Sequence, residues 1–336
     1  WYTFQLEYGI LFNCYIQFSF FIQDNSQKIK GKDFRPRFAW RLVLLFFIAC
    51  INSSLFPGEI LMLYALLGYV MIAVCRLSSR SIAIIAGILL LQPLEWGQII
   101  IALLDPAFVI NAQLDAPYWE IVNTVQKEGS FIELCKTALW TGNIANMGWM
   151  LLHGRVTQTA GLFMVGILIG RSNLFHYTEQ NIRFWTKVFI AVTIAFFPIY
   201  GLTAILPDFI TREALLVPST LLLKSLSNIA FTGILFAGVI LVYYLTKLRG
   251  ILHQLAPYGR MSLTNYLSQS LIGGFLFYNW GLGLYRYTGI TVCILIGVGI
   301  FFIQFCFCRW WLRSHPQGPL EWLWKKATWI NVGNRL

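Results

Sequence analysis

The stretch 258–278 is apolar overall but contains polar side chains at helical spacing: Thr264, Asn265, Gln269 and Ser270. Asn265 and Gln269 are four residues apart and therefore share one helix face. An unpaired amide or hydroxyl costs several kcal/mol in hydrocarbon, so these groups must face protein, water or a ligand. They either hydrogen-bond to neighbouring helices or bind a substrate or cofactor, with Arg260 at the entrance of the stretch.

A second polar motif, His-Gly-Arg-Val-Thr-Gln-Thr, occupies residues 153–159 at the start of an apolar run. An arginine well inside a membrane span costs about 2.5 to 3.5 kcal/mol on insertion scales, so Arg155 should be paired or face water. Gln158 lies one helical turn further on. In the alternative interpretation, Arg155 extends along the helix to the membrane interface.

Asn52 and Glu59 flank a predicted tight turn, Phe-Pro-Gly-Glu, at residues 56–59. Glu59 is either a solvated loop carboxylate or a general base that opens onto a cavity. The sequence contains no nucleophile elbow, HExxH motif or Walker motif, so it does not indicate a known hydrolase or nucleotide site.

The composition requires these residues to be held by membrane helices. Of 336 residues, 57% are hydrophobic and 12% charged, and the mean hydropathy is +0.65. A soluble domain cannot bury that much apolar surface, so we expect an all-α, polytopic transmembrane bundle. The net charge of +11 resides in short loops beside apolar runs, which fits the positive-inside rule and argues against nucleic acid as a partner.

Hydropathy and charge predict about nine spans in a single transmembrane domain, 1–336. We expect them near 1–22, 38–56, 60–75, 81–104, 150–170, 184–206, 215–245, 258–278 and 290–307. Prolines are expected to kink the span 184–206 at Pro198 and to break the start of 215–245 at Pro218. The region 105–149 is expected on the outer side as a loop or re-entrant segment. Basic residues place the loop 28–41 and the tail 309–336 in the cytoplasm.

The seven cysteines show neither CxxC nor Cys/His metal-ligand spacing, so we expect no disulfide and no metal. The chain begins at Trp1 within an apolar, aromatic segment. We therefore expect either that a preceding segment is missing or that the numbering starts within the protein.

Four ordered motifs resemble the YeiB-like bacterial inner-membrane proteins, a family catalogued as a domain of unknown function. The motifs are Gly58-Glu59-Ile60-Leu61 with Tyr64, Arg155-Val156-x-Gln158-Thr159-x-Gly161-Leu162-Phe163, Gly259-Arg260-Met261-Ser262-Leu263-Thr264-Asn265-Tyr266, and Gln317-Gly318-Pro319-Leu320-Glu321-Trp322-Leu323-Trp324. The resemblance covers nearly the whole chain and implies a multi-pass protein of the inner membrane. Family members usually have one more N-terminal helix, which would precede Trp1 and give about ten spans.

This family is distantly similar to membrane acyltransferases such as heparan-α-glucosaminide N-acetyltransferase. The resemblance implies transfer of an acyl group from cytosolic acyl-CoA to a small-molecule or glycan acceptor at or across the lipid bilayer. It makes Glu59, His153 and Asn52 the catalytic candidates. Many members carry His in place of Asn52 and Asp in place of Glu59, and Asn cannot act as a base. The binding candidates are Arg155, Gln158, Arg260, Thr264, Asn265, Tyr266 and Gln269.

Two other functions stay open: a small-molecule transporter and a membrane scaffold without a ligand. Energetic cost against lipid predicts that one shared polar cavity is bordered by Arg155, Gln158, Arg260, Asn265 and Gln269. The tail around Trp322 and Trp324 is expected to fold back against the cytoplasmic face, with Glu321 paired with a basic loop residue such as Arg260.

Overall fold

A computed structural model describes residues 33–110 and 114–330, and every regular element in these ranges is a helix. The all-α expectation is therefore confirmed for the described residues. They cluster into two compact units built from alternating stretches of chain. The first unit contains 33–35, 69–110 and 149–249, and the second contains 36–68, 115–148 and 250–330. The single domain 1–336 stays a prediction.

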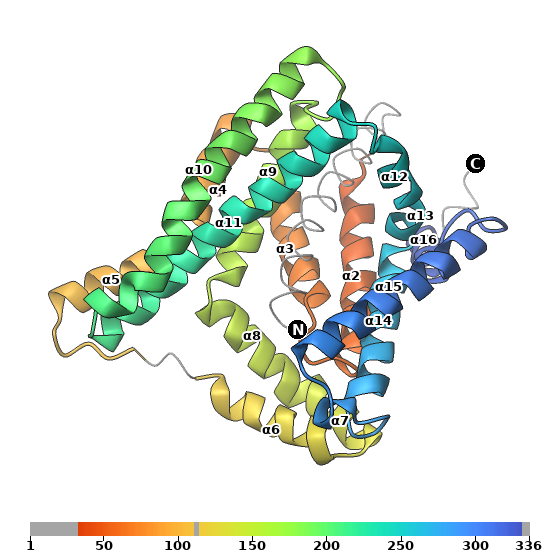
Figure 1. Ribbon diagram of the computed structural model, residues 1–336, viewed down its shortest axis with the longest axis horizontal. Helices are drawn as coiled ribbons and strands as arrows, with labels where there is room; N and C mark the ends of the chain where they lie inside the picture. Colours follow the sequence, from red (N-terminus) through yellow and green to blue (C-terminus); the bar gives the residue numbers. More distant parts are fainter. Residues whose placement is uncertain (1–32, 111–113, 331–336) are drawn as a thin grey trace. The chain divides into compact units, whose positions relative to one another are not determined.

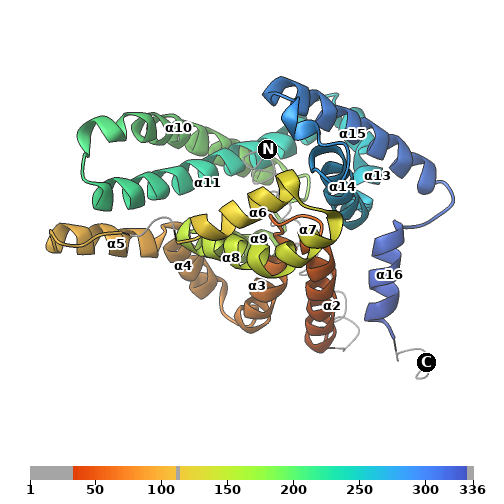
Figure 2. The same cartoon turned by 90° about the horizontal axis from the view of Figure 1, so that it is seen from below.

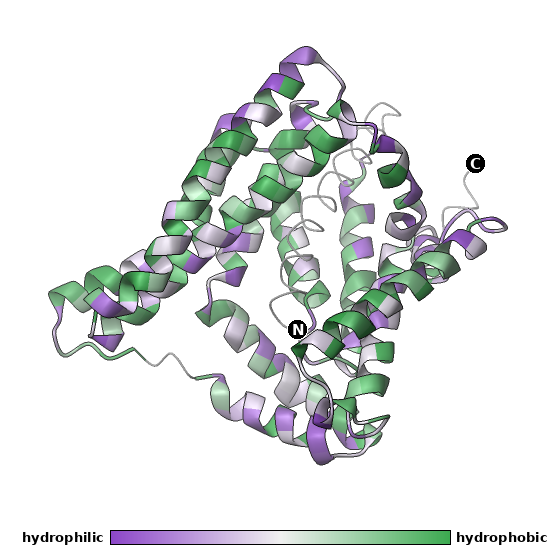
Figure 3. Cartoon of the chain, viewed as in Figure 1, coloured by the Kyte–Doolittle hydropathy of each residue, from purple (hydrophilic) through white to green (hydrophobic). Residues whose placement is uncertain are grey.

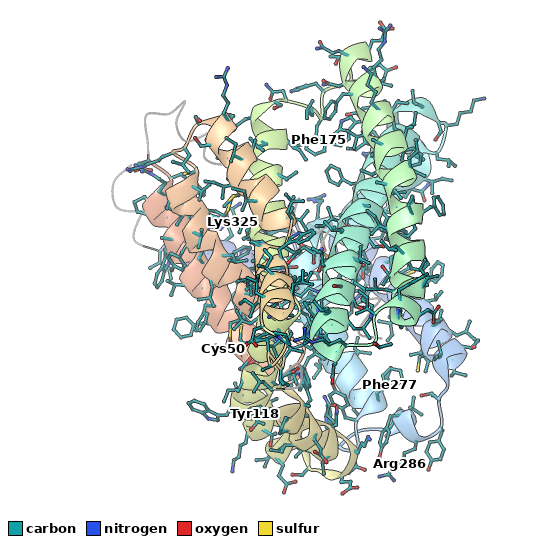
Figure 4. All side chains as sticks on the ribbon, turned by 90° about the vertical axis from the view of Figure 1, so that its left-hand side faces the viewer. Cys50, Tyr118, Phe175, Phe277, Arg286 and Lys325 are labelled. Carbon is teal, nitrogen blue, oxygen red and sulfur yellow. The ribbon has the colours of Figure 1, made fainter. Side chains whose placement is uncertain are left out.

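The first unit is built mainly from α4 (Ser79–Leu90), α5 (Pro93–Leu104), α9 (Arg155–Arg171), α10 (Glu179–Phe209) and α11 (Glu213–Leu245). Helices α10 and α11 form an antiparallel pair, which both cartoon views show side by side (Figures 1 and 2). Helix α4 packs on α9, and α5 packs on α11. At one end of the pair, Trp185 and Ile240 form an aromatic-rich core to which Phe175, labelled in Figure 4, contributes its ring.

Helix α10 is apolar along most of its length, as the hydropathy colouring shows (Figure 3). Exposed side chains such as Ile194 and Phe197 on its surface are suited to lipid contact. Pro198 and Pro207 both lie inside α10, and Pro218 lies inside α11. The predicted break at Pro218 is therefore wrong, because α11 already begins at Glu213. Membrane helices tolerate proline where neighbouring groups compensate for the lost hydrogen bond.

The predicted single span 81–104 is divided into α4 and α5, which meet at an angle of 49°. Gln92 lies between them in the left-handed conformation, with φ of 58°, and Pro93 begins α5. The proline ring disfavours the right-handed helical conformation at the preceding residue, which favours a break of the helix at Gln92. The expectation of one continuous helix is corrected to a broken pair.

The second unit has more elements than the first, and most of them are shorter. It includes the first turns of α3 (Leu61–Val74), up to Gly68, which lies against Leu42 of α2. Its other elements are α2 (Arg35–Ser53), α6 (Ala116–Glu128), α7 (Phe131–Thr137), the π-helical turn η1 (Ala138–Gly142), α8 (Asn143–Leu152), α12 (Arg249–Gln254), α13 (Ala256–Arg260), α14 (Ser262–Phe277), the 3₁₀ turn η2 (Leu284–Arg286), α15 (Ile290–Trp311) and α16 (Pro319–Thr328). The region 105–149 thus contains helices, and its placement on the outer side stays a prediction.

Four helices of the described residues are long and apolar enough to cross a membrane: α2, α10, α11 and α15. The bent pair α4–α5 adds a fifth if it counts as one span. Helices α3, α9 and α14 coincide with predicted spans but have only 14, 17 and 16 residues. The predicted span 1–22 and the basic loop at 28–32 lie outside the described residues. The protein is therefore a helical membrane protein, and the count of nine spans stays a prediction.

The C-terminal helix α16 packs against the first turns of α2 through cation–π contacts and hydrogen bonds. Arg41 lies over the ring of Trp324 and Arg37 over that of Trp329, each at 4.4 Å from the ring centroid. Trp324 Nε1 also donates to the backbone oxygen of Arg41 at 3.2 Å, and Arg37 Nη1 donates to that of Thr328 at 3.1 Å. A cation at the last carbonyls of a helix is electrostatically favourable. The tail therefore folds back as expected, although its cytoplasmic placement stays a prediction.

Candidate functional site

The turn between α2 and α3 directs the carboxyl group of Glu59 into the second unit. Leu61 N donates to Glu59 Oε1 at 2.5 Å, so the carboxylate caps the N-terminus of α3. Asn146 Nδ2 on α8 holds the turn from the other side by donating to the backbone oxygen of Glu59, also at 2.5 Å. Glu59 is 0% exposed. The alternative of a solvated loop carboxylate is therefore wrong, because these donors fold the turn inward.

Two further side chains contact the Glu59 carboxylate, one from before it in the chain and one from after it. Asn52 Nδ2, in the last turn of α2, donates to Glu59 Oε2, and Tyr266 Oη on α14 lies 3.4 Å from Oε1. Asn52 is also 0% exposed, and its Oδ1 has no hydrogen-bond partner among the described residues. The structure thus brings together three sequence-predicted residues, and it leaves one buried acceptor available beside the carboxylate.

Burial raises the pKa of Glu59 to about 7, although the hydrogen bonds from Asn52, Leu61 and Tyr266 oppose that rise. Removal of the carboxylate from water disfavours its charged form, and donors that point at the oxygens favour it. A carboxyl group with this balance exchanges its proton near neutral pH. It therefore has the property that a general base requires.

The amides on α14 bond to the helices around them. Gln269 Nε2 donates to Tyr258 Oη at 2.9 Å and to Gln304 Oε1 at 3.0 Å. Asn265 Nδ2 donates to the backbone oxygen of Tyr258 at 3.0 Å, and Cys308 Sγ lies 3.3 Å from Asn265 Oδ1. These contacts match the first alternative for Asn265 and Gln269, hydrogen bonding between neighbouring helices. Their role in ligand binding stays a prediction.

Thr264 and Arg260, at the start of α14, contact the C-terminal segment. Thr264 donates to the carboxylate of Glu321 from its backbone N at 3.0 Å and from Oγ1 at 2.5 Å. Arg260 Nη2 instead donates to the backbone oxygen of Pro316 at 2.6 Å. The predicted ion pair between Glu321 and Arg260 is therefore wrong, because the first turn of α14 supplies the donors that Glu321 needs.

The motif at 153–159 forms the turn into α9 in the first unit. Arg155 Nη1 donates to Gln158 Oε1 at 2.8 Å, and the guanidinium lies 5.7 Å from the ring centroid of Trp149. Gln158 Nε2 continues to the backbone oxygen of Ser225 on α11 at 3.3 Å. His153 stacks on Trp149, with ring centroids 4.7 Å apart. Arg155 is thus directed inward to an amide and an aromatic ring, in contrast to the interface alternative.

Sequence reasoning missed two polar residues at the break between α4 and α5. Gln92 is 0% exposed and Glu95 is 2% exposed, and both approach the turn at Gly154. A Gln-Pro pair followed by an acidic residue within an otherwise apolar run was the available signal. The mean hydropathy of the run outweighs this pair and favours a single span.

The predicted residues therefore belong to two groups. Asn52, Glu59 and the α14 residues lie in the second unit, whereas His153, Arg155 and Gln158 lie in the first. The single cavity predicted to join Arg155 with the α14 amides spans both units and stays a prediction. Within the described ranges, no cluster of three or more His, Cys, Asp or Glu side chains is arranged to hold a metal ion.

Comparisons with known proteins agree with the motif resemblance. Residues 169–331 match the family described as protein of unknown function, DUF418. The chain is 24% identical to the uncharacterized protein YxaH of Bacillus subtilis, over 97% of this chain and 81% of that protein. It is 28% identical to the uncharacterized protein YeiB of Escherichia coli, over 86% and 74% respectively. No solved structure matches significantly. The chain is therefore similar to YeiB-like proteins of unknown function, and the DUF418 match lies in its residues 169–331.

Proposed function

We propose that this membrane protein is an acyltransferase in which Glu59 acts as the general base. The observation that carries this proposal is the buried Glu59 carboxyl group, held by Asn52 Nδ2 and Leu61 N, with Tyr266 Oη nearby. A positioned base with a pKa near the working pH contributes about 10² to 10⁴ in rate. Because its contacts leave Asn52 Oδ1 unpaired, that oxygen can accept a hydrogen bond from an incoming hydroxyl or amine.

The reaction transfers an acyl group from acyl-CoA to the hydroxyl or amine of the acceptor. Glu59 takes the acceptor proton as the new acyl–oxygen or acyl–nitrogen bond forms and the carbon–sulfur bond breaks. The same proton then passes from Glu59 to the CoA thiolate, so free thiol and acylated acceptor are the products. Glu59 is thereby regenerated in its charged form, and no other reactant is required.

Arg260 supports a place for the anionic donor. Its guanidinium is exposed and uses one nitrogen to contact Pro316, which leaves further donors for the phosphates of CoA. Lys247 and Arg249, in the first unit, are likewise exposed after the end of α11. In this proposal these groups face the cytoplasm of a bacterial cell, the C-terminus lies on the same side, and the acceptor is a membrane lipid, small molecule or glycan.

A transporter is the second candidate, and the broken α4–α5 pair favours it. Transporter sites are often built where a membrane helix is interrupted, because the free backbone and polar groups there can contact a solute. The buried Gln92 and Glu95 at this break fit such a site.

The decisive experiment is transfer of labelled acyl groups by the purified protein in lipid nanodiscs. Labelled acetyl-CoA and long-chain acyl-CoA are each incubated with total bacterial lipid and with an extract of small molecules and glycans. We expect label on an acceptor, and Glu59→Gln should lower the rate at least about 100-fold. Glu120→Gln, the same change at an exposed glutamate of α6, should leave the rate unchanged. Absence of transfer with every acceptor fraction, or full activity of Glu59→Gln, would overturn the proposal.

A further inference from the structure

The break between α4 and α5 places an acidic side chain where no cation neutralises it. Glu95 is 2% exposed in the first turn of α5, within a helix pair whose apolar character is that of a membrane span. It forms no ion pair within the described residues. A lone carboxylate is costly inside a membrane protein, and such residues mark ion or proton sites by default.

The surroundings of Glu95 are oxygen-rich. Thr157 Oγ1 lies 2.8 Å from Gln92 Oε1 and 2.9 Å from the backbone oxygen of Gly154. With the Gln92 amide turned so that its nitrogen faces this cluster, that nitrogen lies 3.2 Å from Glu95 Oε2 and 3.2 Å from the Gly154 oxygen. Gln92 from the turn before α5, Gly154 from the turn before α9 and Thr157 from α9 thus meet around the Glu95 carboxyl group.

Gly154 shows that this arrangement is tightly built. It adopts φ of 62°, which other L-residues rarely take, and a Cβ there would meet Gln92 Oε1 and Glu95 Oε1. The turn into α9 therefore approaches the two polar side chains more closely than any other residue would allow. Glycine is needed here both for its conformation and for its lack of a side chain.

Opposing effects act on the charge of Glu95. The N-terminal turns of α5 and α9 both lie beside it and favour the carboxylate, whereas the apolar surroundings favour the neutral acid. Arg155, the cation next to Gly154 in sequence, is directed to Gln158 and Trp149. The other titratable groups on α4, α9, α11 and the turn before α9 are Arg80, His153, Arg171, Glu213, Lys224, Tyr243 and Tyr244.

The Gln92 amide can satisfy Glu95 in both protonation states. Its NH₂ donates to the ionised carboxylate, and after half a turn its carbonyl accepts from the protonated acid. We propose that Glu95, with Gln92, Gly154 and Thr157, forms a reversible proton-binding site at the break between α4 and α5. The bound proton forms an O–H bond at a Glu95 oxygen and leaves by the reverse step, with no other reactant.

Infrared difference spectroscopy of the protein in lipid nanodiscs tests this site, since the C=O stretch of a protonated carboxyl is separate from that of a carboxylate. The measurement uses a Glu59→Gln background, so that the second buried glutamate does not contribute and the result is independent of acyl transfer. We expect a band that titrates with pH and is absent when Glu95→Gln is added. Adding Glu120→Gln should leave the band unchanged, and size-exclusion profiles should show that all variants fold.

Gln92→Leu tests whether the Gln92 amide sets the proton affinity of Glu95 or whether burial alone does. Loss of the charge-assisted hydrogen bond should raise the titration midpoint by one pH unit or more, which is a tenfold change in proton affinity. An unchanged spectrum in Glu95→Gln, or an unchanged midpoint in Gln92→Leu, would overturn the proposal. A midpoint that falls as sodium is added would also overturn it, because sodium would then be the ion that the oxygens bind.

Discussion

Glu59 and Glu95 are both glutamates buried at the start of an apolar helix, but their surroundings differ. Glu59 accepts hydrogen bonds from Asn52 and from Leu61 N, with Tyr266 at a longer distance. Glu95 has one hydrogen-bonding side chain in the described part of the protein, the reversible Gln92 amide. The comparison shows that two buried carboxyl groups can behave differently. Fixed donors hold that of Glu59 in one geometry, whereas the partner of Glu95 can adjust to its charge.

Removal of the Glu59 side chain should have the largest effect on stability. Glu59→Ala leaves Asn52 Nδ2 and Leu61 N buried without an acceptor, at about 1 to 3 kcal/mol each. We expect a loss of about 3 to 5 kcal/mol in the free energy of unfolding, measured by denaturant titration in detergent. Glu59→Gln keeps one acceptor oxygen and should lose less. Equal stability of Glu59→Ala and the parent would show that the fixed donors are not important.

Gly154→Ala tests the tightness of the Glu95 surroundings. The left-handed backbone costs alanine about 1 to 2 kcal/mol, and the new methyl group would displace Gln92 and Glu95. We expect a total loss of about 3 kcal/mol in the same assay. Gly97→Ala is the matched control, since Gly97 lies inside helix α5 and a Cβ there meets nothing within 4 Å. Similar losses in both variants would contradict the tight packing inferred at Gly154.

The pH dependence of stability should distinguish Glu59 from a solvated glutamate. Its folded pKa is about 7 against a reference of 4.5, so between these values the folded state keeps a proton that the unfolded state has lost. Stability should therefore fall as pH rises through this interval, by about 3 kcal/mol. Cysteine and tyrosine side chains in model peptides ionise only above about pH 8, so the nearby Cys50, Tyr64 and Tyr266 contribute little there. In a Glu95→Gln background, which removes the second buried glutamate, Glu59→Gln should abolish this fall, and a fall that persists would assign it elsewhere.

Tyr266→Phe should have the smallest effect. Its hydroxyl lies 3.4 Å from Glu59 Oε1, which is long for a hydrogen bond. We expect a loss of about 0.5 kcal/mol and a small upward shift of the Glu59 titration, because one weak donor to the carboxylate is removed. Tyr118→Phe is the control, since this tyrosine of α6 has an exposed side chain (Figure 4). A loss above about 2 kcal/mol would place Tyr266 among the fixed donors.

Sequence reasoning predicted the long apolar helices because their composition alone determines them. Helices α2, α10, α11 and α15 fall where the apolar runs predict them. The break at Gln92 was missed, since the average hydropathy of the run outweighs a single pre-proline residue. The burial of Glu59 was left open, because it depends on Asn146, 87 residues further along the chain. Local patterns carry no information about such partners.

The contact between Arg37 and Thr328 joins positions 291 residues apart in the chain. A ribosome that adds about 5 to 20 residues per second needs about 15 to 60 s to cover this distance. During this time α2 is already synthesised, whereas Trp324 and Trp329, the aromatic partners of its arginines, do not yet exist. The first described helix therefore acquires its final neighbours only at the end of synthesis, and completion of this fold has to follow translation.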